Sequence, residues 1–140
     1  MSHQRVYKSQ DYMQPSADEP IRSVIVESAH SVIVAWHVKP GQTIAPHTHP
    51  DGQDTWTILS GEGRYQVDAD GNAVSIAPGD VVVAGKGQVH GVLCTSMEPL
   101  QFISVVGPWM RVMRCVCEPG TQLSRTWVQD GSLVTPKARC

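Results

Sequence analysis

The sequence predicts a single all-β domain, built from short antiparallel strands in a sandwich or barrel. Short runs rich in Val, Ile and Thr follow one another along most of the chain, and Gly, Pro, Asn and Asp separate them. No stretch of ten or more residues keeps the apolar stripe of an amphipathic helix. The length of 140 residues is that of one domain, which buries roughly 68–70% of its unfolded surface.

The predicted strands are connected by recognisable turns. Residues 70–72 (Asp-Gly-Asn) are a strong hairpin signal. Residues 77–80 (Ala-Pro-Gly-Asp) fit a type II turn, in which Gly79 supplies the positive φ of the third position. The predicted strands cover residues 21–28, 31–39, 43–49, 54–60, 64–68, 73–76, 81–84, 90–94, 100–106 and 111–117.

The pattern divides the chain into three segments. Residues 1–20 contain two prolines and little apolar periodicity, which is typical of an N-terminal arm. Residues 21–117 form the predicted β-barrel domain. Residues 118–140 are polar and rich in turn residues, so we expect a C-terminal tail there.

The composition argues against several classes of partner. A net charge of -2, with 17% charged residues, offers no basic surface for nucleic acid. No apolar run approaches the ~20 residues of a membrane-spanning helix. Residues 1–20 are polar and lack the charged-then-apolar pattern of a secretory signal, so we expect a cytoplasmic protein.

Three histidines indicate a metal site. His47 and His49 are two positions apart on a predicted strand, so their side chains point to the same side. His90 begins another predicted strand. A third imidazole from a second strand, with a nearby carboxylate or amide, completes a site suited to a divalent metal ion.

The spacing of these histidines resembles the two motifs of the cupins. The first motif runs from a Gly through five residues to His-x-His, and from there to an acidic residue and a second Gly; Gly41, His47, His49, Asp54 and Gly61 occupy these places. The second motif is matched by Gly79, Gly87 and His90. The resemblance implies a small single-domain jelly-roll barrel with a metal ion at these residues. It also implies a homodimer, because small cupins commonly pair through their sheets and N-terminal arms.

The fourth metal ligand is open between two neighbouring residues. Asp54 stands where cupins most often have Glu, and its side chain is one methylene shorter. Gln53 is the alternative, because some cupins coordinate through an amide. Successive residues of a strand face opposite sides, so only one of the two is expected to reach the ion. Gly85 replaces the proline of the second motif.

The predicted ion is a single Fe, Zn, Mn or Ni per chain, because imidazoles suit these metals and a carboxylate adds affinity for the harder ones. The predicted substrate pocket is apolar and aromatic. It is formed by Trp36, Trp56, Ile58 and Phe102, and Val81 and Val83 are also expected to face the interior.

These features predict a metal-dependent enzyme for a small aromatic or enolisable organic molecule. Its reaction is either oxygenation at iron, or cyclisation or isomerisation at Zn, Mn or Ni, as in the small cupins of aromatic polyketide pathways. The alternative is a non-catalytic cupin that binds a small ligand or senses a metal. The sequence names no catalytic proton donor or base.

Overall fold

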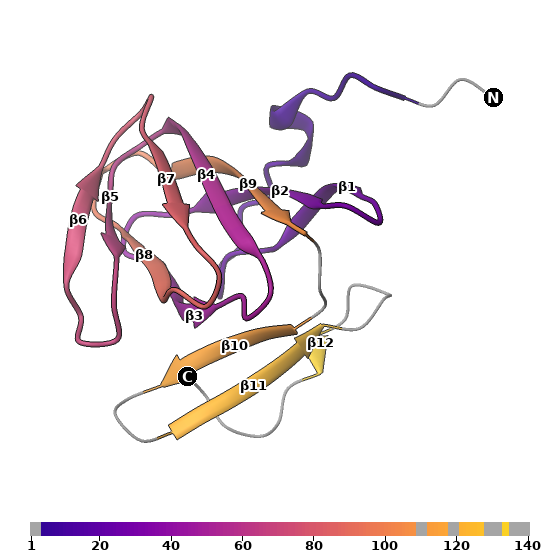
Figure 1. Cartoon of the computed structure of the whole chain (residues 1–140). Helices are drawn as coiled ribbons and strands as arrows, with labels where there is room; N and C mark the ends of the chain where they lie inside the picture. Colours follow the sequence, from indigo (N-terminus) through magenta and orange to yellow (C-terminus); the bar gives the residue numbers. More distant parts are fainter. Residues whose placement is uncertain (1–3, 109–111, 118–120, 128–132, 135–140) are drawn as a thin grey trace.

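The computed structural model describes residues 4–108, 112–117, 121–127 and 133–134, which form two facing β-sheets (Figure 1). The elements are η1 (Ser9–Tyr12), β1 (Ser23–Glu27), β2 (Val32–Val38), β3 (Thr43–Thr48), β4 (Gln53–Ser60), β5 (Gly63–Gln66), β6 (Ala73–Ile76), β7 (Val81–Ala84), β8 (His90–Cys94), β9 (Leu100–Gly107), β10 (Val112–Cys117), β11 (Thr121–Trp127) and β12 (Leu133–Val134).

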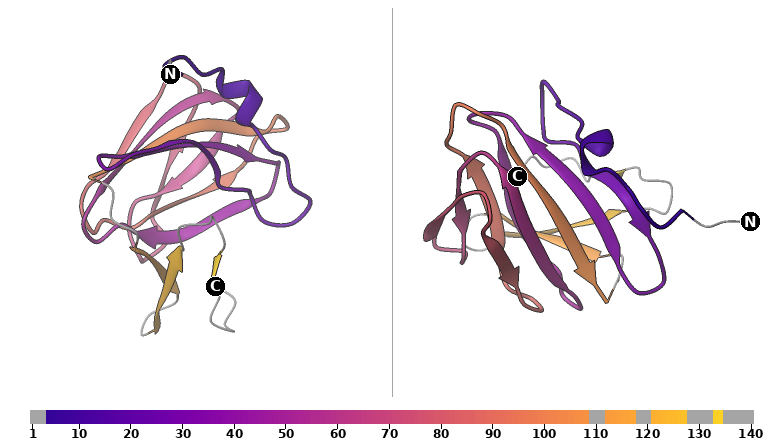
Figure 2. Two further views of the ribbon diagram at one scale, coloured as in Figure 1. Left: turned by 90° about the vertical axis from the view of Figure 1, so that its right-hand side faces the viewer. Right: turned by 90° about the horizontal axis from the view of Figure 1, so that it is seen from above.

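The sheets have the layered arrangement of a jelly roll. One sheet has the strand order β1-β2-β9-β4-β7 and the other β12-β11-β10-β3-β8-β5-β6. The paired strands are antiparallel, for example β2 with β9 and β3 with β8. Views from the side and from above show the two layers, which stay separate sheets and do not close into one (Figure 2). The predicted all-β jelly-roll fold is confirmed.

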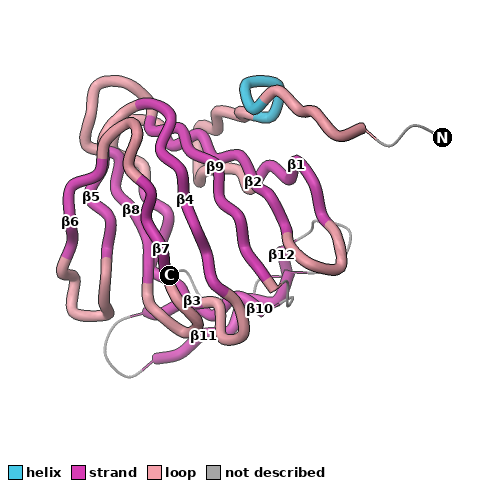
Figure 3. Tube along the Cα trace, turned by 45° about the horizontal axis from the view of Figure 1, so that its top comes forward, coloured by secondary structure: helices cyan, strands magenta, loops and turns pink. Residues whose placement is uncertain are grey.

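All ten predicted strands are present, with ends within two residues of the predicted ones. The tail holds two further strands, β11 and β12, that were not predicted. β11 pairs with β10 along its whole length, and β10 pairs with β3. The chain therefore continues the seven-stranded sheet beyond residue 117, as the trace in Figure 3 shows.

The hydrophobic core lies between the sheets. Strand β4 shows the alternation clearly, because Asp54, Trp56 and Ile58 are buried while Gln53 is exposed. The main cluster consists of Val38, Trp56, Ile58, Tyr65, Ile76, Val92, Cys94, Leu100 and Phe102. Along β4, the core includes Trp56 and Ile58. The polar cluster described below lies at the Asp54 end of the same strand.

The prediction for Val81 and Val83 is wrong. Both face outward, with 59% and 52% of their surface exposed. In the β4–β7 pairing, Ala84 lies opposite Asp54, and Val82 lies opposite Trp56, so Val82 and Ala84 occupy the inner face. A run of consecutive valines carries no alternation, and the sequence therefore does not reveal which ones face the core.

The predicted type II turn before β7 is consistent with the structure. Gly79 has a φ of 91°, and the Asp80 N–H donates to the carbonyl oxygen of Ala77 at 3.0 Å. The turn is anchored to β4, because the Gly79 N–H donates to the carbonyl oxygen of Ile58.

The N-terminal arm is tied to the sandwich by amide side chains. Nε2 of Gln42 donates to the carbonyl oxygens of Ser16 and Asp18, at 3.0 and 2.6 Å. Gln14 in turn contacts the hydroxyl of Ser23. Among the described residues, no helix is long and apolar enough to cross a membrane.

Candidate metal centre

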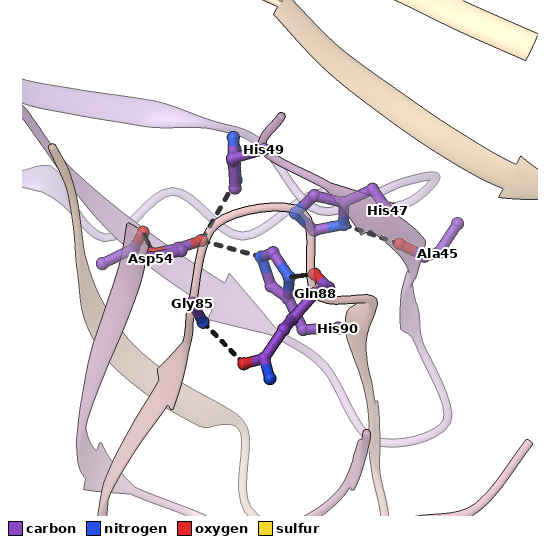
Figure 4. A network of polar contacts seen from close by, with 8 residues as sticks. Ala45, His47, His49, Asp54, Gly85, Gln88 and His90 are labelled. Atoms are coloured by element: carbon purple, nitrogen blue, oxygen red, sulfur yellow. Dashed lines mark hydrogen bonds and ion pairs between the residues drawn. The ribbon is translucent and has the colours of Figure 1, made fainter. Parts of the chain in front are cut away.

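Four side chains converge at one end of the sandwich: His47, His49, Asp54 and His90 (Figure 4). All four are buried, and each offers one ligand atom within 4.8 Å of the others. They come from three strands, because His47 lies on β3 with His49 directly after it, Asp54 on β4 and His90 at the start of β8. The cluster therefore joins the two sheets.

Strand pairing explains the meeting of the histidines. His47 and His90 are direct partners in the β3–β8 ladder, and their ring centroids are 4.2 Å apart. The ring of His49 lies 5.2 Å from each of the other two. The spacing of two between His47 and His49 thus places both imidazoles on the inner side, as predicted.

Backbone carbonyls fix the orientation of two of the imidazoles. Nδ1 of His47 lies 2.8 Å from the carbonyl oxygen of Ala45, and Nδ1 of His90 lies 3.0 Å from that of Gln88. A carbonyl oxygen only accepts hydrogen bonds, so both Nδ1 atoms carry the hydrogen. The Nε2 lone pair of each neutral ring is then available, which is the usual arrangement of a metal-ligating histidine.

Asp54 is held as a carboxylate in this cluster. Its Oδ2 lies 3.1 Å from Nε2 of His90 and 3.3 Å from Nε2 of His49, and its Oδ1 accepts a hydrogen bond of 2.5 Å from the Ser104 hydroxyl. Burial raises the pKa of the Asp54 carboxyl, but hydrogen bonds with His49, His90 and Ser104 lower it by more. The pKa therefore lies well below its usual range. Asp54 is therefore ionised at neutral pH.

This geometry fits a bound cation. With its hydrogen on Nδ1, neutral His90 turns the Nε2 lone pair toward Oδ2 of Asp54, so two electron-rich atoms face each other. Such a contact is repulsive unless a proton or a metal ion lies between the groups, and the hydrogen bonds that lower the pKa of Asp54 require that proton in the protein without metal. Three nitrogen donors and one oxygen donor suit Fe, Zn, Mn or Ni.

The buried imidazole of His47 gives the protein without metal a pH-dependent stability. Burial, reinforced by His90 and His49, lowers the pKa of His47 to about 3. The unfolded chain binds a proton at His47 near pH 6.5 and the folded chain does not. The contribution of His47 to the free energy of unfolding is therefore fully present above pH 6.5 and is lost as the pH falls toward 3. Between pH 7 and pH 5 we expect a loss of about 2 kcal/mol in the free energy of unfolding.

Urea titrations of the metal-free protein at the two pH values measure this loss. A His47→Gln variant, which lacks the titrating group, should show a smaller difference, and a variant of exposed His30 should retain the full one. Asp54 contributes nothing in this window because its unfolded pKa is near 3.8. Equal stability of the wild type at both pH values would contradict the burial of a neutral His47.

The loop before β8 positions two of the site residues. The Gly87 N–H donates to the carbonyl oxygen of His49 at 2.9 Å. The Gly85 N–H donates to Oε1 of Gln88 at 2.7 Å, a bond that is visible in Figure 4. Proline has no N–H. The replacement of the motif proline by Gly85 therefore allows this bond, which holds Gln88 beside His90.

Gln53 is not part of the cluster. Its side chain is exposed on the opposite face of β4, where Nε2 donates to Oγ1 of Thr55 at 3.1 Å. Of the two alternatives for the fourth ligand, the structure brings Asp54 and not Gln53 to the histidines.

The residues predicted to form a substrate pocket lie in or against the core. Trp56, Ile58 and Phe102 are almost completely buried, and Trp36 is half-buried and stacks on Phe102. Trp56 connects core and cluster, because its ring centroid lies 4.2 Å from that of Phe102 and 5.7 Å from that of His90. The role of these residues in substrate binding stays a prediction.

Sequence reasoning missed the residues that orient the cluster. Ser104 lies fifty positions from Asp54, and only the β4–β9 pairing brings it there. Gln88 and Ala45 act through their main-chain oxygens, which any residue type would supply. Alternation along β9 does place Ser104 on the same face as Phe102, and that was the one available signal.

Comparison with known proteins finds the same architecture. The family model of the cupin domain matches residues 34–106. A protein with a double-stranded β-helix domain from Klebsiella pneumoniae subsp. pneumoniae MGH 78578 is 43% identical, with a TM-score of 0.79, covering 83% of this chain and 100% of that one. No curated protein matches the chain.

More distant structures share the fold. An RmlC-like cupin protein from Desulfovibrio desulfuricans is 22% identical, with a TM-score of 0.68, over 76% of this chain and 98% of that one. The polyketide cyclase RemF from Streptomyces resistomycificus is 19% identical, with a TM-score of 0.68, over 85% of this chain and 89% of its own.

Proposed function

This chain belongs to the cupin family, and from this premise we propose that it is a metal-dependent enzyme acting on a small aromatic or enolisable organic molecule. The observation that carries the proposal is the buried set of His47, His49, Asp54 and His90. Histidines that only pack in a hydrophobic core need no carboxylate in common, whereas His49 and His90 both contact Asp54. Four convergent donors, three of which have their outer atoms hydrogen-bonded, are typical of a metal-ligand set.

The charge of the cluster favours an anionic ligand. Three neutral imidazoles and the Asp54 carboxylate carry about one negative charge, so a divalent ion leaves about one positive charge in a buried place. The Ser104 hydroxyl donates to Oδ1 of Asp54, so Oδ2 would be the carboxylate atom that holds the ion. When bound, the ion would polarise an oxygen of the substrate or, as iron, support oxygen activation.

The neighbouring core favours an aromatic or other apolar ligand body. Trp56 lies directly beside His90 and continues into the cluster of Ile58 and Phe102. We place redox-neutral cyclisation or isomerisation first, because a polyketide cyclase is among the proteins that share this fold over most of their length. Oxygenation is the second candidate, and the favouring observation is the set of histidines with one carboxylate, which resembles the sites of iron oxygenases.

The test uses ortho-hydroxyacetophenone, which offers two oxygen atoms and an enolisable methyl group. We expect the protein loaded with Zn²⁺, Mn²⁺ or Ni²⁺ to accelerate exchange of the methyl hydrogens for deuterium in D₂O, as followed by NMR. The His90→Ala variant treated in the same way is the control. Oxygen uptake with Fe²⁺ in place of exchange would identify the oxygenase.

The outcome that contradicts an enzyme is retention of the compound without exchange or oxygen uptake with any of these metals. The chain would then be a non-catalytic cupin that binds a small ligand. Titration calorimetry with the same compound distinguishes this result from a failure to bind.

A further inference from the structure

Tyr65 lies on the same inner face as the histidines. It is on β5, between exposed Arg64 and half-buried Gln66, and its own side chain is only 7% exposed. In the β5–β8 ladder it is paired with Val92, which places His90 at the diagonal position of the neighbouring strand. Diagonal neighbours on one face of a sheet are within reach of an aromatic side chain.

Ring contacts connect Tyr65 to the cluster. Its ring packs edge-to-face against Trp56, with centroids 5.2 Å apart and planes at 82°. Trp56 in turn lies 5.7 Å from the ring of His90. The three rings form a continuous row from β5 across β4 to the candidate metal centre.

The Tyr65 hydroxyl has no hydrogen-bond partner in the described part of the chain. The only fully enclosed side-chain nitrogen or oxygen there without a partner is Nε1 of Trp56, so the Tyr65 oxygen is not sealed off in the same way. Burial raises the pKa of Tyr65, and the negative charge of Asp54 raises it further. The phenol therefore stays protonated and is a permanent donor near the cluster.

We propose that the Tyr65 hydroxyl donates a hydrogen bond to an oxygen atom of the ligand held at the His47, His49, Asp54 and His90 cluster. This inference rests on the proposed function and narrows its substrate class. A ligand with two neighbouring oxygen atoms, such as a catecholate or an enolised hydroxyketone, presents one to the cluster and one to Tyr65. In this position Tyr65 orients the ligand and stabilises negative charge on its oxygen.

The experiment uses nitrocatechol, a coloured molecule with two neighbouring oxygen atoms, and protein loaded with Zn²⁺. We expect Tyr65→Phe to retain the Zn²⁺ content of the wild type and to bind nitrocatechol about 10- to 100-fold more weakly, as for one lost hydrogen bond to a charged acceptor. The absorption maximum of the bound probe should also shift, which a purely structural role of the ring would not cause.

Two controls isolate the hydroxyl. Tyr12→Phe deletes the same atom in η1, on the N-terminal arm, and should leave nitrocatechol affinity unchanged. 1-Methylimidazole binds through its one free nitrogen and presents only a methyl group on its other side, which neither donates to Tyr65 nor accepts from it. Its affinity for the loaded protein should therefore be equal in the wild type and in Tyr65→Phe.

The outcomes separate the two proposals. Equal nitrocatechol affinity and an equal spectrum in wild type and Tyr65→Phe would overturn the role of Tyr65 and leave the metal-dependent function standing. A similar loss of 1-methylimidazole and nitrocatechol affinity would also overturn it, because the variant would then disturb the cluster itself. Failure of the wild type to take up Zn²⁺, Fe²⁺, Mn²⁺ or Ni²⁺ would refute the proposed function, and the role of Tyr65 with it.

Discussion

Each of His47→Ala, His49→Ala and His90→Ala is expected to abolish tight binding of a divalent ion and to leave the β fold largely intact. Each change removes one of three nitrogen donors. Loss of a direct ligand should exceed the roughly 10- to 100-fold cost that is typical of losing a residue that only orients a ligand. Competition with a coloured zinc chelator measures the affinity, and circular dichroism the fold.

The matched control is His30→Ala, because His30 is exposed and lies outside the cluster. That variant should bind the ion as the wild type does. Retention of full affinity in all three cluster variants would mean that the ion binds elsewhere and that the four buried side chains are structural.

Among single substitutions in the turns, Gly61→Ala is expected to cause the largest loss of stability. Gly61 has a φ of 72°, and a Cβ atom there would lie 2.7 Å from Cα of Leu100 and against the carbonyl oxygen of Pro99. The left-handed conformation costs about 1–2 kcal/mol and overpacking about 1–3 kcal/mol more. The sum is about 2–5 kcal/mol, which urea unfolding measures.

Gly79→Ala is the control for the backbone conformation alone. Gly79 has a φ of 91°, but a Cβ atom there would meet nothing within 4 Å. Its expected cost is only the conformational part, about 1–2 kcal/mol. Equal losses in the two variants would contradict the close approach of Gly61 to the segment before β9.

The strands could be predicted from the sequence because residues with particular backbone conformations mark their boundaries. Gly79 provides the positive φ that its turn requires, and alternation along β4 separates Asp54 from Gln53. The inner face of β7 was not predictable, since Val81, Val82 and Val83 are chemically identical and only pairing with β4 distinguishes them. Strand β11 lies in a polar segment whose pairing with β10 is a tertiary effect.

The site was predictable to the extent that its candidate ligands are side chains with a fixed spacing. His47, His49 and His90 meet as the motifs imply, and Asp54 joins them. Ser104 and the carbonyl oxygens of Ala45 and Gln88 were not predictable, because long-range pairing and main-chain geometry supply them.

The central claim is that the buried cluster holds a metal ion, and elemental analysis of the untagged protein tests it most directly. The protein should be purified without contact with a nickel column, beside its His47→Ala variant. We expect about one equivalent of Fe, Zn, Mn or Ni per chain in the wild type and a loss of that metal in the variant, because one cluster is present in the described residues. Absence of bound metal from both proteins, also after incubation with each of these ions, would contradict the claim.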